Sequence, residues 1–148
     1  MNINCLDYTF KYGSLDIYLA GCKGPHCPGC HNEELWDFKN GTKWTKWKDE
    51  ISWYIEIFGR YINNIMVFGG EPFDQDLKDL VDFLVFIKSK KKKVWVFTRY
   101  EEEKISLGAK QFIDYLKCGW YDQNQQTEDN IQFGIPLATS NQYIVEVD

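Results

Sequence analysis

The chain has 148 residues, of which 44% are hydrophobic and 17% aromatic, and its formal net charge is −5. This length and composition indicate a single globular domain, residues 1–148, with enough apolar side chains to bury a core. The acidic balance argues against general binding to nucleic acid, which depends on clustered lysine and arginine. Neither a signal peptide nor an apolar stretch of membrane-spanning length is present, so we expect a cytoplasmic protein without a membrane partner.

A loop with three cysteines follows the first predicted strand. Alternating side chains over Leu15–Leu19 predict that strand, and it leads directly to Cys22, Cys27 and Cys30. Glycines and prolines between the cysteines favour a tight loop over a helix or strand. Structural zinc sites and electron-transfer clusters usually use four protein ligands. Three thiolates can instead hold a four-iron cluster with one iron left free for a group that is not protein.

Zinc is the alternative metal for this loop, because His26 or His31 could provide a fourth ligand. If the loop binds a cluster, we expect both histidines and Asn32 to donate hydrogen bonds to sulfur and tune the cluster's potential. Crowded cysteines suit a reducing compartment in which thiols bind metal. The other two cysteines, Cys5 and Cys118, are expected to be free thiols outside the cluster.

A helix is predicted next, over Lys46–Phe58, where apolar residues recur at helical spacing. Thr45 is a suitable N-cap and Gly59 a suitable end. Three tryptophans that follow the cysteine loop are expected in the core or as a cover that shields the cluster from water: Trp36, Trp44 and Trp47.

A second strand and helix repeat this pattern. The apolar run Ile65–Phe68 predicts a buried strand, and the spacing over Leu77–Ile87 predicts a helix that Asp74 or Gln75 could open. Val94–Phe97 predicts a third apolar strand. The lysine-rich run between them, 88–93, is interpreted as a solvated helix end favoured by the helix dipole, with a docking patch for an acidic partner as the alternative.

The pattern weakens after residue 101. Residues 109–119 combine a short helical pattern with a possible strand at Tyr115–Cys118, residues 122–130 are polar and indicate a loop, and Gln142–Val147 predicts a final strand. Five or six strands alternating with helices predict an α/β fold with a mostly parallel sheet. That number is too small for a closed eight-unit barrel. Functional residues should gather at the carboxyl ends of the strands.

The segment Gly69–Gly70–Glu71–Pro72 ends the second strand. Paired glycines let the backbone approach a ligand closely, although an ordinary turn has the same composition. Glu71 is an anionic acceptor suited to an ammonium group. Thr98, at the end of the third strand, is a further candidate for ligand contact.

These motifs, taken in order, resemble the radical S-adenosylmethionine (SAM) enzymes, and within them the glycyl-radical activating proteins of anaerobic ribonucleotide reductase. The resemblance rests on five segments and covers most of the chain: Leu19–Cys22, Cys27–Asn32, Phe68–Pro72, Phe97–Tyr100 and Ser140–Tyr143.

The resemblance implies an open, partial βα barrel of radical SAM type. It also implies a [4Fe-4S] cluster on Cys22, Cys27 and Cys30, with no catalytic residues beyond these ligands. SAM would be bound by the following residues: Asn32, Gly69, Gly70, Glu71 and Thr98.

The implied reaction is reductive cleavage of SAM to a 5′-deoxyadenosyl radical, with an external one-electron donor. A chain this short has little left over for a deep substrate pocket, which favours a protein substrate. By resemblance that substrate is the large subunit of anaerobic ribonucleotide reductase, which receives a glycyl radical. The alternatives are a radical SAM enzyme acting on a small molecule or another peptide, and a non-catalytic iron–sulfur or zinc protein.

Two features depart from the pattern of this family. Four residues, rather than the usual three, separate Cys22 from Cys27, and the usual Thr-Gly-Tyr reads Thr-Arg-Tyr, with Arg99 in the middle. The bend at Gly24–Pro25 can absorb the extra loop residue, so we expect the cluster to survive.

Overall fold

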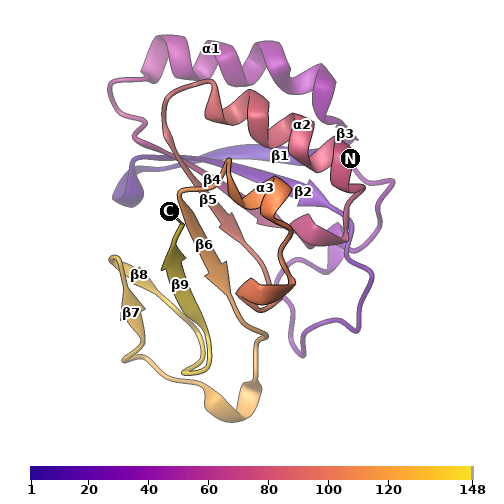
Figure 1. The fold of residues 1–148 in the computed structure, drawn as a ribbon, viewed down its shortest axis with the longest axis vertical. Coiled ribbons are helices and arrows are strands. Elements are labelled where there is room, and N and C mark those ends of the chain that lie inside the picture. The colour runs from indigo at the N-terminus through magenta and orange to yellow at the C-terminus, as the bar shows by residue number, and fades with distance from the viewer. Residues whose placement is uncertain (148) are drawn as a thin grey trace.

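One mixed β-sheet organises the fold, with the strand order β3-β1-β2-β4-β5-β6-β9 (Figure 1). The structure is a computed structural model that describes residues 1–147. Its strands are β1 (Asn2–Thr9), β2 (Ser14–Ala20), β3 (Thr42–Lys43), β4 (Asn64–Gly69), β5 (Lys93–Phe97), β6 (Tyr115–Cys118), β7 (Ile131–Gln132), β8 (Ile135–Pro136) and β9 (Tyr143–Glu146). Its α-helices are α1 (Lys48–Phe58), α2 (Leu77–Lys88) and α3 (Leu107–Lys110). Short 3-10 turns lie at 10–12, 33–35, 44–47, 72–74, 102–104 and 123–125.

Four neighbouring strands, β2, β4, β5 and β6, run parallel. The helices of the intervening crossovers pack on one face of the sheet (Figure 1). Strand β1 pairs antiparallel with β2, β3 with β1 and β9 with β6, so β3 and β9 form open edges and the sheet does not close. The prediction of an α/β fold with a mostly parallel sheet and no closed barrel is confirmed.

Two layers of apolar side chains bury the sheet. On the helix face, alternate strand residues such as Ile17, Val67 and Val96 pack against Phe83 and Leu84 of α2. On the other face, a smaller cluster around Met66 and Trp95 packs under β8 and β9. The parallel strands are therefore covered on both sides, as their continuous apolar runs predicted.

The strand count, the start of α1 and the N-caps of α1 and α2 differ from the prediction. The main sheet has seven strands rather than five or six, because β1 and β3 were not predicted. Thr45 is not the cap of α1, since it lies in a 3-10 turn that continues into the helix at Lys48. Neither Asp74 nor Gln75 opens α2, because the side chain of Asp76 accepts the hydrogen bond from Asp79 N. The helix end at Gly59 is confirmed.

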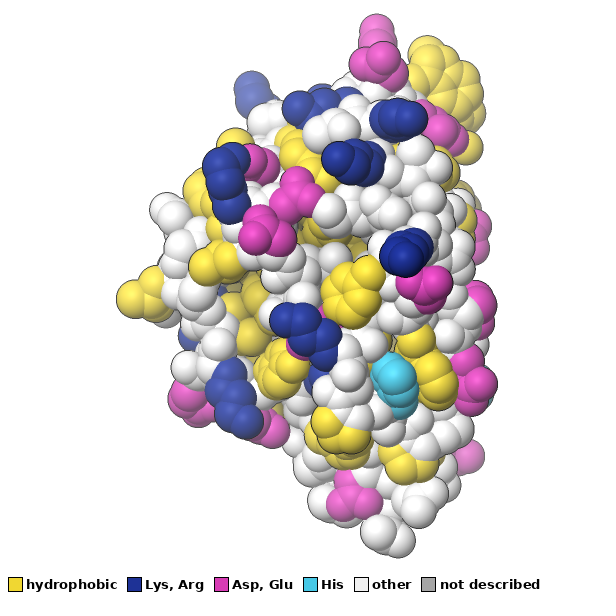
Figure 2. Space-filling view, turned by 90° about the vertical axis from the view of Figure 1, so that its right-hand side faces the viewer, with side chains coloured by type: hydrophobic (Ala, Val, Ile, Leu, Met, Phe, Trp, Pro, Cys, Tyr) yellow, Lys and Arg dark blue, Asp and Glu magenta, His cyan; other side chains and the backbone are white. Residues whose placement is uncertain are grey.

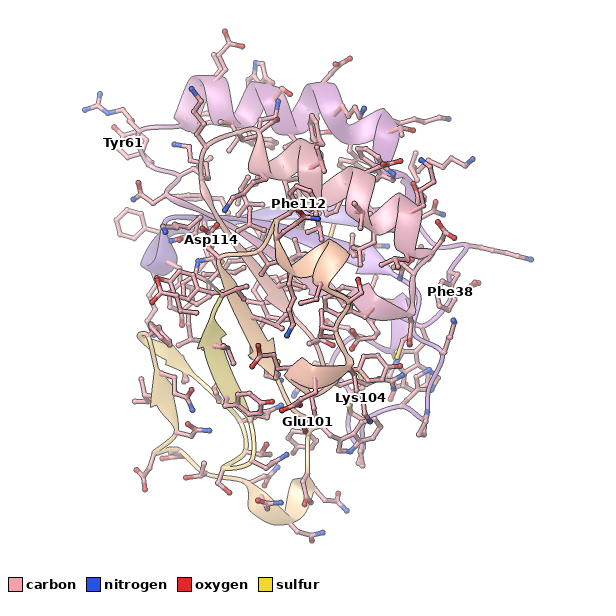
Figure 3. The ribbon with its side chains drawn as sticks, in the orientation of Figure 1. Phe38, Tyr61, Glu101, Lys104, Phe112 and Asp114 are labelled. Carbon is pink, nitrogen blue, oxygen red and sulfur yellow. The ribbon has the colours of Figure 1, made fainter. Side chains whose placement is uncertain are left out.

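The lysine-rich run is partly engaged in internal contacts. Lys88 Nζ lies 2.6 Å from Asp114 Oδ2, which also accepts from Val94 N at 2.7 Å. Asp114, labelled in Figure 3, thereby ties the end of α2 to β5 and β6. Elsewhere, on the face drawn in Figure 2, lysine and arginine side chains are interspersed with aspartate and glutamate. Within residues 1–147, no helix is both long and apolar enough to cross a membrane.

Backbone hydrogen bonds join the carboxyl ends of β2 and β4. Gly70 N donates to Leu19 O at 2.9 Å, and Glu71 N donates to Gly21 O at 2.7 Å. A Cβ at Gly70 would overlap the backbone of Gly21, so only glycine permits this approach. Phe38, labelled in Figure 3, packs its ring against Gly21 from another direction. The start of the cysteine loop is therefore fixed to the end of β4.

Replacing Gly70 with alanine should push the cysteine loop away from β4. We expect Gly70→Ala to lower the free energy of unfolding by about 1–3 kcal/mol or more, as measured by urea denaturation. Gly108→Ala is the matched control, because an added Cβ there meets only the Ser106 hydroxyl, at 3.8 Å. The control should be neutral or slightly stabilising. Equal stability of the two variants would contradict this account of the contact.

Candidate functional site

A cavity of about 160 Å³ opens where β2, β4, β5 and β6 end. It is lined by Cys22, Cys27, Cys30, Asn32, Trp36, Gly69, Gly70, Glu71, Phe97, Thr98, Arg99 and Lys117. All eight site residues proposed from the sequence lie among them. The fold thus brings together four separate segments of the chain, as expected for loops that follow neighbouring parallel strands.

Backbone hydrogen bonds fix the start of the cysteine loop and close a turn within it. Cys22 N donates to Trp36 O at 3.1 Å, and Cys30 N donates to Cys27 O at 3.2 Å. The ring of His26 stacks on Trp36 with centroids 3.7 Å apart, and its Nε2 lies 3.0 Å from Cys22 O. His26 is thus engaged with a backbone carbonyl rather than with a cysteine sulfur.

The donor set fits an iron–sulfur cluster. Cys22, Cys27 and Cys30 are free thiols, all partly buried and all facing one cavity. Thiolates are the usual protein ligands of such clusters. Burial raises the pKa of Cys22 and Cys27, and the nearby cation of Arg99 opposes that rise. Within residues 1–147, no three His, Cys, Asp or Glu side chains already stand where they could hold a metal ion.

Glu71 is a buried carboxylate at the wall of the cavity, with 2% of its surface exposed. It accepts hydrogen bonds from Thr98 Oγ1 at 2.6 Å, Arg99 N at 2.9 Å and Phe73 N at 3.1 Å. Burial raises the pKa of Glu71, and these hydrogen bonds oppose the rise. A carboxylate offers about four acceptor positions, so one remains for a ligand. Thr98 serves to orient Glu71 from the neighbouring strand.

Lys117 is a cavity residue that the sequence reasoning missed. Its Nζ donates to Gly119 O at 3.2 Å, and burial lowers its pKa to about 8. The usable signal was the alternation of β6, which puts Lys117 on the face opposite the core residues Leu116 and Cys118. The cavity is therefore lined by two cations, Arg99 and Lys117, and by the buried anion Glu71.

Of the three tryptophans expected near the cysteine loop, only Trp36 lines the cavity. Trp44 lies in the core, 4% exposed, with its Nε1 donating to Asp79 Oδ1 at 2.6 Å, and Trp47 packs against the same core. Of the two places expected for these tryptophans, Trp36 borders the site, whereas Trp44 and Trp47 take the core. Both lie in the 3-10 turn that leads into α1, which covers the helix face of the sheet.

The last motif, Ser140–Tyr143, forms hydrogen bonds to the segment that follows β6. Asn141 Nδ2 donates to Trp120 O at 2.7 Å, and Gln142 Nε2 donates to Gly119 O at 3.3 Å. Both bonds hold the segment that follows β6 and Lys117. Cys118 is fully buried in the core and Cys5 is exposed; neither lines the cavity.

Comparison with known proteins agrees with this geometry. A family model described as a 4Fe-4S single cluster domain matches residues 14–144, a range that includes the whole cavity. Over 117 residues the chain is 26% identical to the anaerobic ribonucleoside-triphosphate reductase-activating protein of Enterobacteria phage T4, covering 76% of this chain and 73% of the relative. The resemblance to the activating proteins is thereby confirmed. The chain belongs to the 4Fe-4S single cluster domain family.

Proposed function

We propose that this protein is a radical SAM activating enzyme that generates a glycyl radical on the large subunit of an anaerobic ribonucleotide reductase. The observation that carries the proposal is the meeting of three cysteine thiols with Gly69, Gly70 and Glu71 in one cavity. The open sheet with four parallel strands is compatible with a partial βα barrel. The similarity to the phage T4 activating protein supports the choice of partner.

Each group in the cavity has a chemical role in this proposal. Cys22, Cys27 and Cys30 would hold a [4Fe-4S] cluster, which supplies an electron from an external donor and a free iron for the amino and carboxylate groups of SAM. Glu71 has an acceptor position free for an N–H of the iron-bound SAM amino group, and a hydrogen bond there would favour the ionised form of this buried acid. Lys117 offers a cation to the carboxylate of SAM.

The size of the cavity favours a protein substrate. Sites for small ligands usually measure about 300–1,000 Å³, so the cluster and SAM would already fill this cavity of about 160 Å³ and extend beyond it. A cofactor bound there would leave no enclosed space for a second small molecule. A flexible glycine-bearing segment of a partner chain needs no such space, because the partner's own surface completes the site.

The function is tested by radical transfer. The anaerobically reconstituted protein, SAM and a strong reductant should yield 5′-deoxyadenosine, and adding the reductase from the same source should give a doublet in its electron paramagnetic resonance spectrum. The doublet is expected because a glycyl radical couples mainly to its one remaining α-hydrogen. Turnover of a small molecule with no radical on the reductase would replace the activating function with the small-substrate alternative.

Cysteine substitution distinguishes the cysteines that bind the cluster from those that do not. Cys22→Ala, Cys27→Ala and Cys30→Ala should each abolish the brown cluster absorption or make it labile, because each removes one of only three thiolates. Cys5→Ala and Cys118→Ala are the controls and should keep full iron content. Loss of iron in either control variant would contradict this assignment. Retention of iron after substitution of any of the three candidate ligands would show that other residues bind the cluster.

Glu71→Ala should weaken SAM binding while the cluster stays assembled. Losing one charge-assisted hydrogen bond should reduce SAM affinity roughly ten- to a hundredfold. Equilibrium binding to the reconstituted protein measures this, with the exposed Glu103→Ala as control. Unchanged affinity for SAM in Glu71→Ala would mean that Glu71 does not accept a hydrogen bond from the SAM amino group.

A further inference from the structure

Arg99 reaches from the end of β5 to the cysteine loop. Its side chain is only 8% exposed, and its guanidinium donates to the carbonyl oxygens of two consecutive loop residues. The Nη1–Pro25 O distance is 2.5 Å and the Nη2–Gly24 O distance is 3.1 Å. These two residues form the bend between Cys22 and Cys27, so the guanidinium fixes the part of the loop that separates two candidate ligands.

A buried acid anchors this guanidinium. Asp74, 5% exposed, accepts from Arg99 Nη2 at 3.0 Å and from Tyr100 OH at 2.5 Å. The same carboxylate accepts from Lys23 N at 2.8 Å, so it holds the loop directly as well. The guanidinium also lies over the ring of Trp120, 5.4 Å from its centroid. A planar group held on several sides has little freedom, which is the geometry arginine provides and lysine does not.

The same side chain borders the cavity together with Cys22 and Cys27. Its Nε is buried without a hydrogen-bond partner and lies 3.9 Å from Glu71 Oε2. The guanidinium places a positive charge at the wall of the cavity that these thiols line. Arg99 therefore acts on the cysteines in two separable ways, through the loop backbone and through its charge.

We propose that Arg99 is a positioning residue for the cluster loop: it clamps the Gly24–Pro25 bend so that Cys22 and Cys27 face the cavity together, and it places a positive charge beside the cluster. The two departures noted in the sequence, the extra loop residue and the arginine in Thr-Arg-Tyr, meet in these hydrogen bonds and compensate one another. The inference rests on cluster binding and not on cleavage of SAM.

Three variants separate the clamp from the charge. Arg99→Met removes both, Arg99→Lys keeps the charge without the two-pronged contact, and Arg60→Met is the control at the chain's other arginine, which is exposed. The reconstituted full chain is mixed with an iron chelator to measure the rate of iron loss. Its cluster reduction potential is measured by spectroelectrochemistry, and folding is checked by circular dichroism.

Arg99→Met should lose iron roughly tenfold faster or more, and its potential should shift to more negative values, because reduction adds negative charge to a site that has lost a cation. Arg99→Lys should also lose iron faster but keep a potential near that of the unmodified protein. Arg60→Met should change neither quantity. If Arg99 had only a structural role, the reduction potential would not change in Arg99→Met while staying the same in Arg99→Lys.

Shortening the loop tests the compensation. Deleting Pro25 in the Arg99→Gly background leaves three residues between the cysteines, and this double variant should retain iron better than Arg99→Gly alone. The proposal is overturned if Arg99→Met keeps its iron and its potential. If Arg99→Met does not fold, then iron retention by Arg99→Lys equal to that of the unmodified protein overturns it. If the unmodified protein does not cleave SAM while Arg99→Met loses iron faster than it, the proposed function is contradicted and this inference stands.

Discussion

The site depends on the backbone contact between the end of β4 and the start of the cysteine loop. Glu71 N donates to Gly21 O, and Gly70 lies too close to Gly21 for any side chain. This one contact places the cysteine loop and the buried carboxylate of Glu71 on the same cavity. The parallel register of β2 and β4 makes it possible, because both strands end at the same edge of the sheet.

Charged side chains of both signs line the cavity. Glu71 and Lys117 line its walls, and Arg99 stands between Glu71 and the loop with Asp74 behind it. Buried charges are costly unless paired or hydrogen-bonded, and each of these groups has at least one partner. The arrangement leaves one acceptor position on Glu71 and one donor on Arg99 Nε facing no protein partner. Arg99 Nε and Glu71 Oε2 lie 3.9 Å apart.

Most of the site was predictable from the sequence because its residues lie in short local motifs. The cysteine loop and Gly69–Glu71 follow predicted strands directly, so the parallel topology alone brings them together. Arg99 and Lys117 could not be assigned in the same way. The role of Arg99 depends on carbonyls some 75 residues away in the chain, and no local pattern encodes such a contact.

The missed elements of the fold have a similar cause. Strand β1 buries only Ile3 fully and mixes polar and apolar residues elsewhere, with a bulge between Ile3 and Cys5, so its strand pattern is weak. The predicted start of α2 at Leu77 is confirmed, but its cap was wrongly assigned because several adjacent residues, Asp74 and Asp76 among them, are chemically suited to cap a helix. Only the tertiary structure shows that Asp74 is engaged by Tyr100 and Arg99 instead.

The central claim is that three thiols and the Gly-Gly-Glu segment form one cofactor site with an open iron. Mössbauer spectroscopy of the ⁵⁷Fe-reconstituted protein, recorded with and without SAM, tests it most directly. We expect a four-iron cluster in which one iron differs from the other three and changes its spectrum when SAM is added. Stoichiometric zinc in place of iron after strictly anaerobic preparation, or a cluster whose four irons are all unaffected by SAM, would contradict the account.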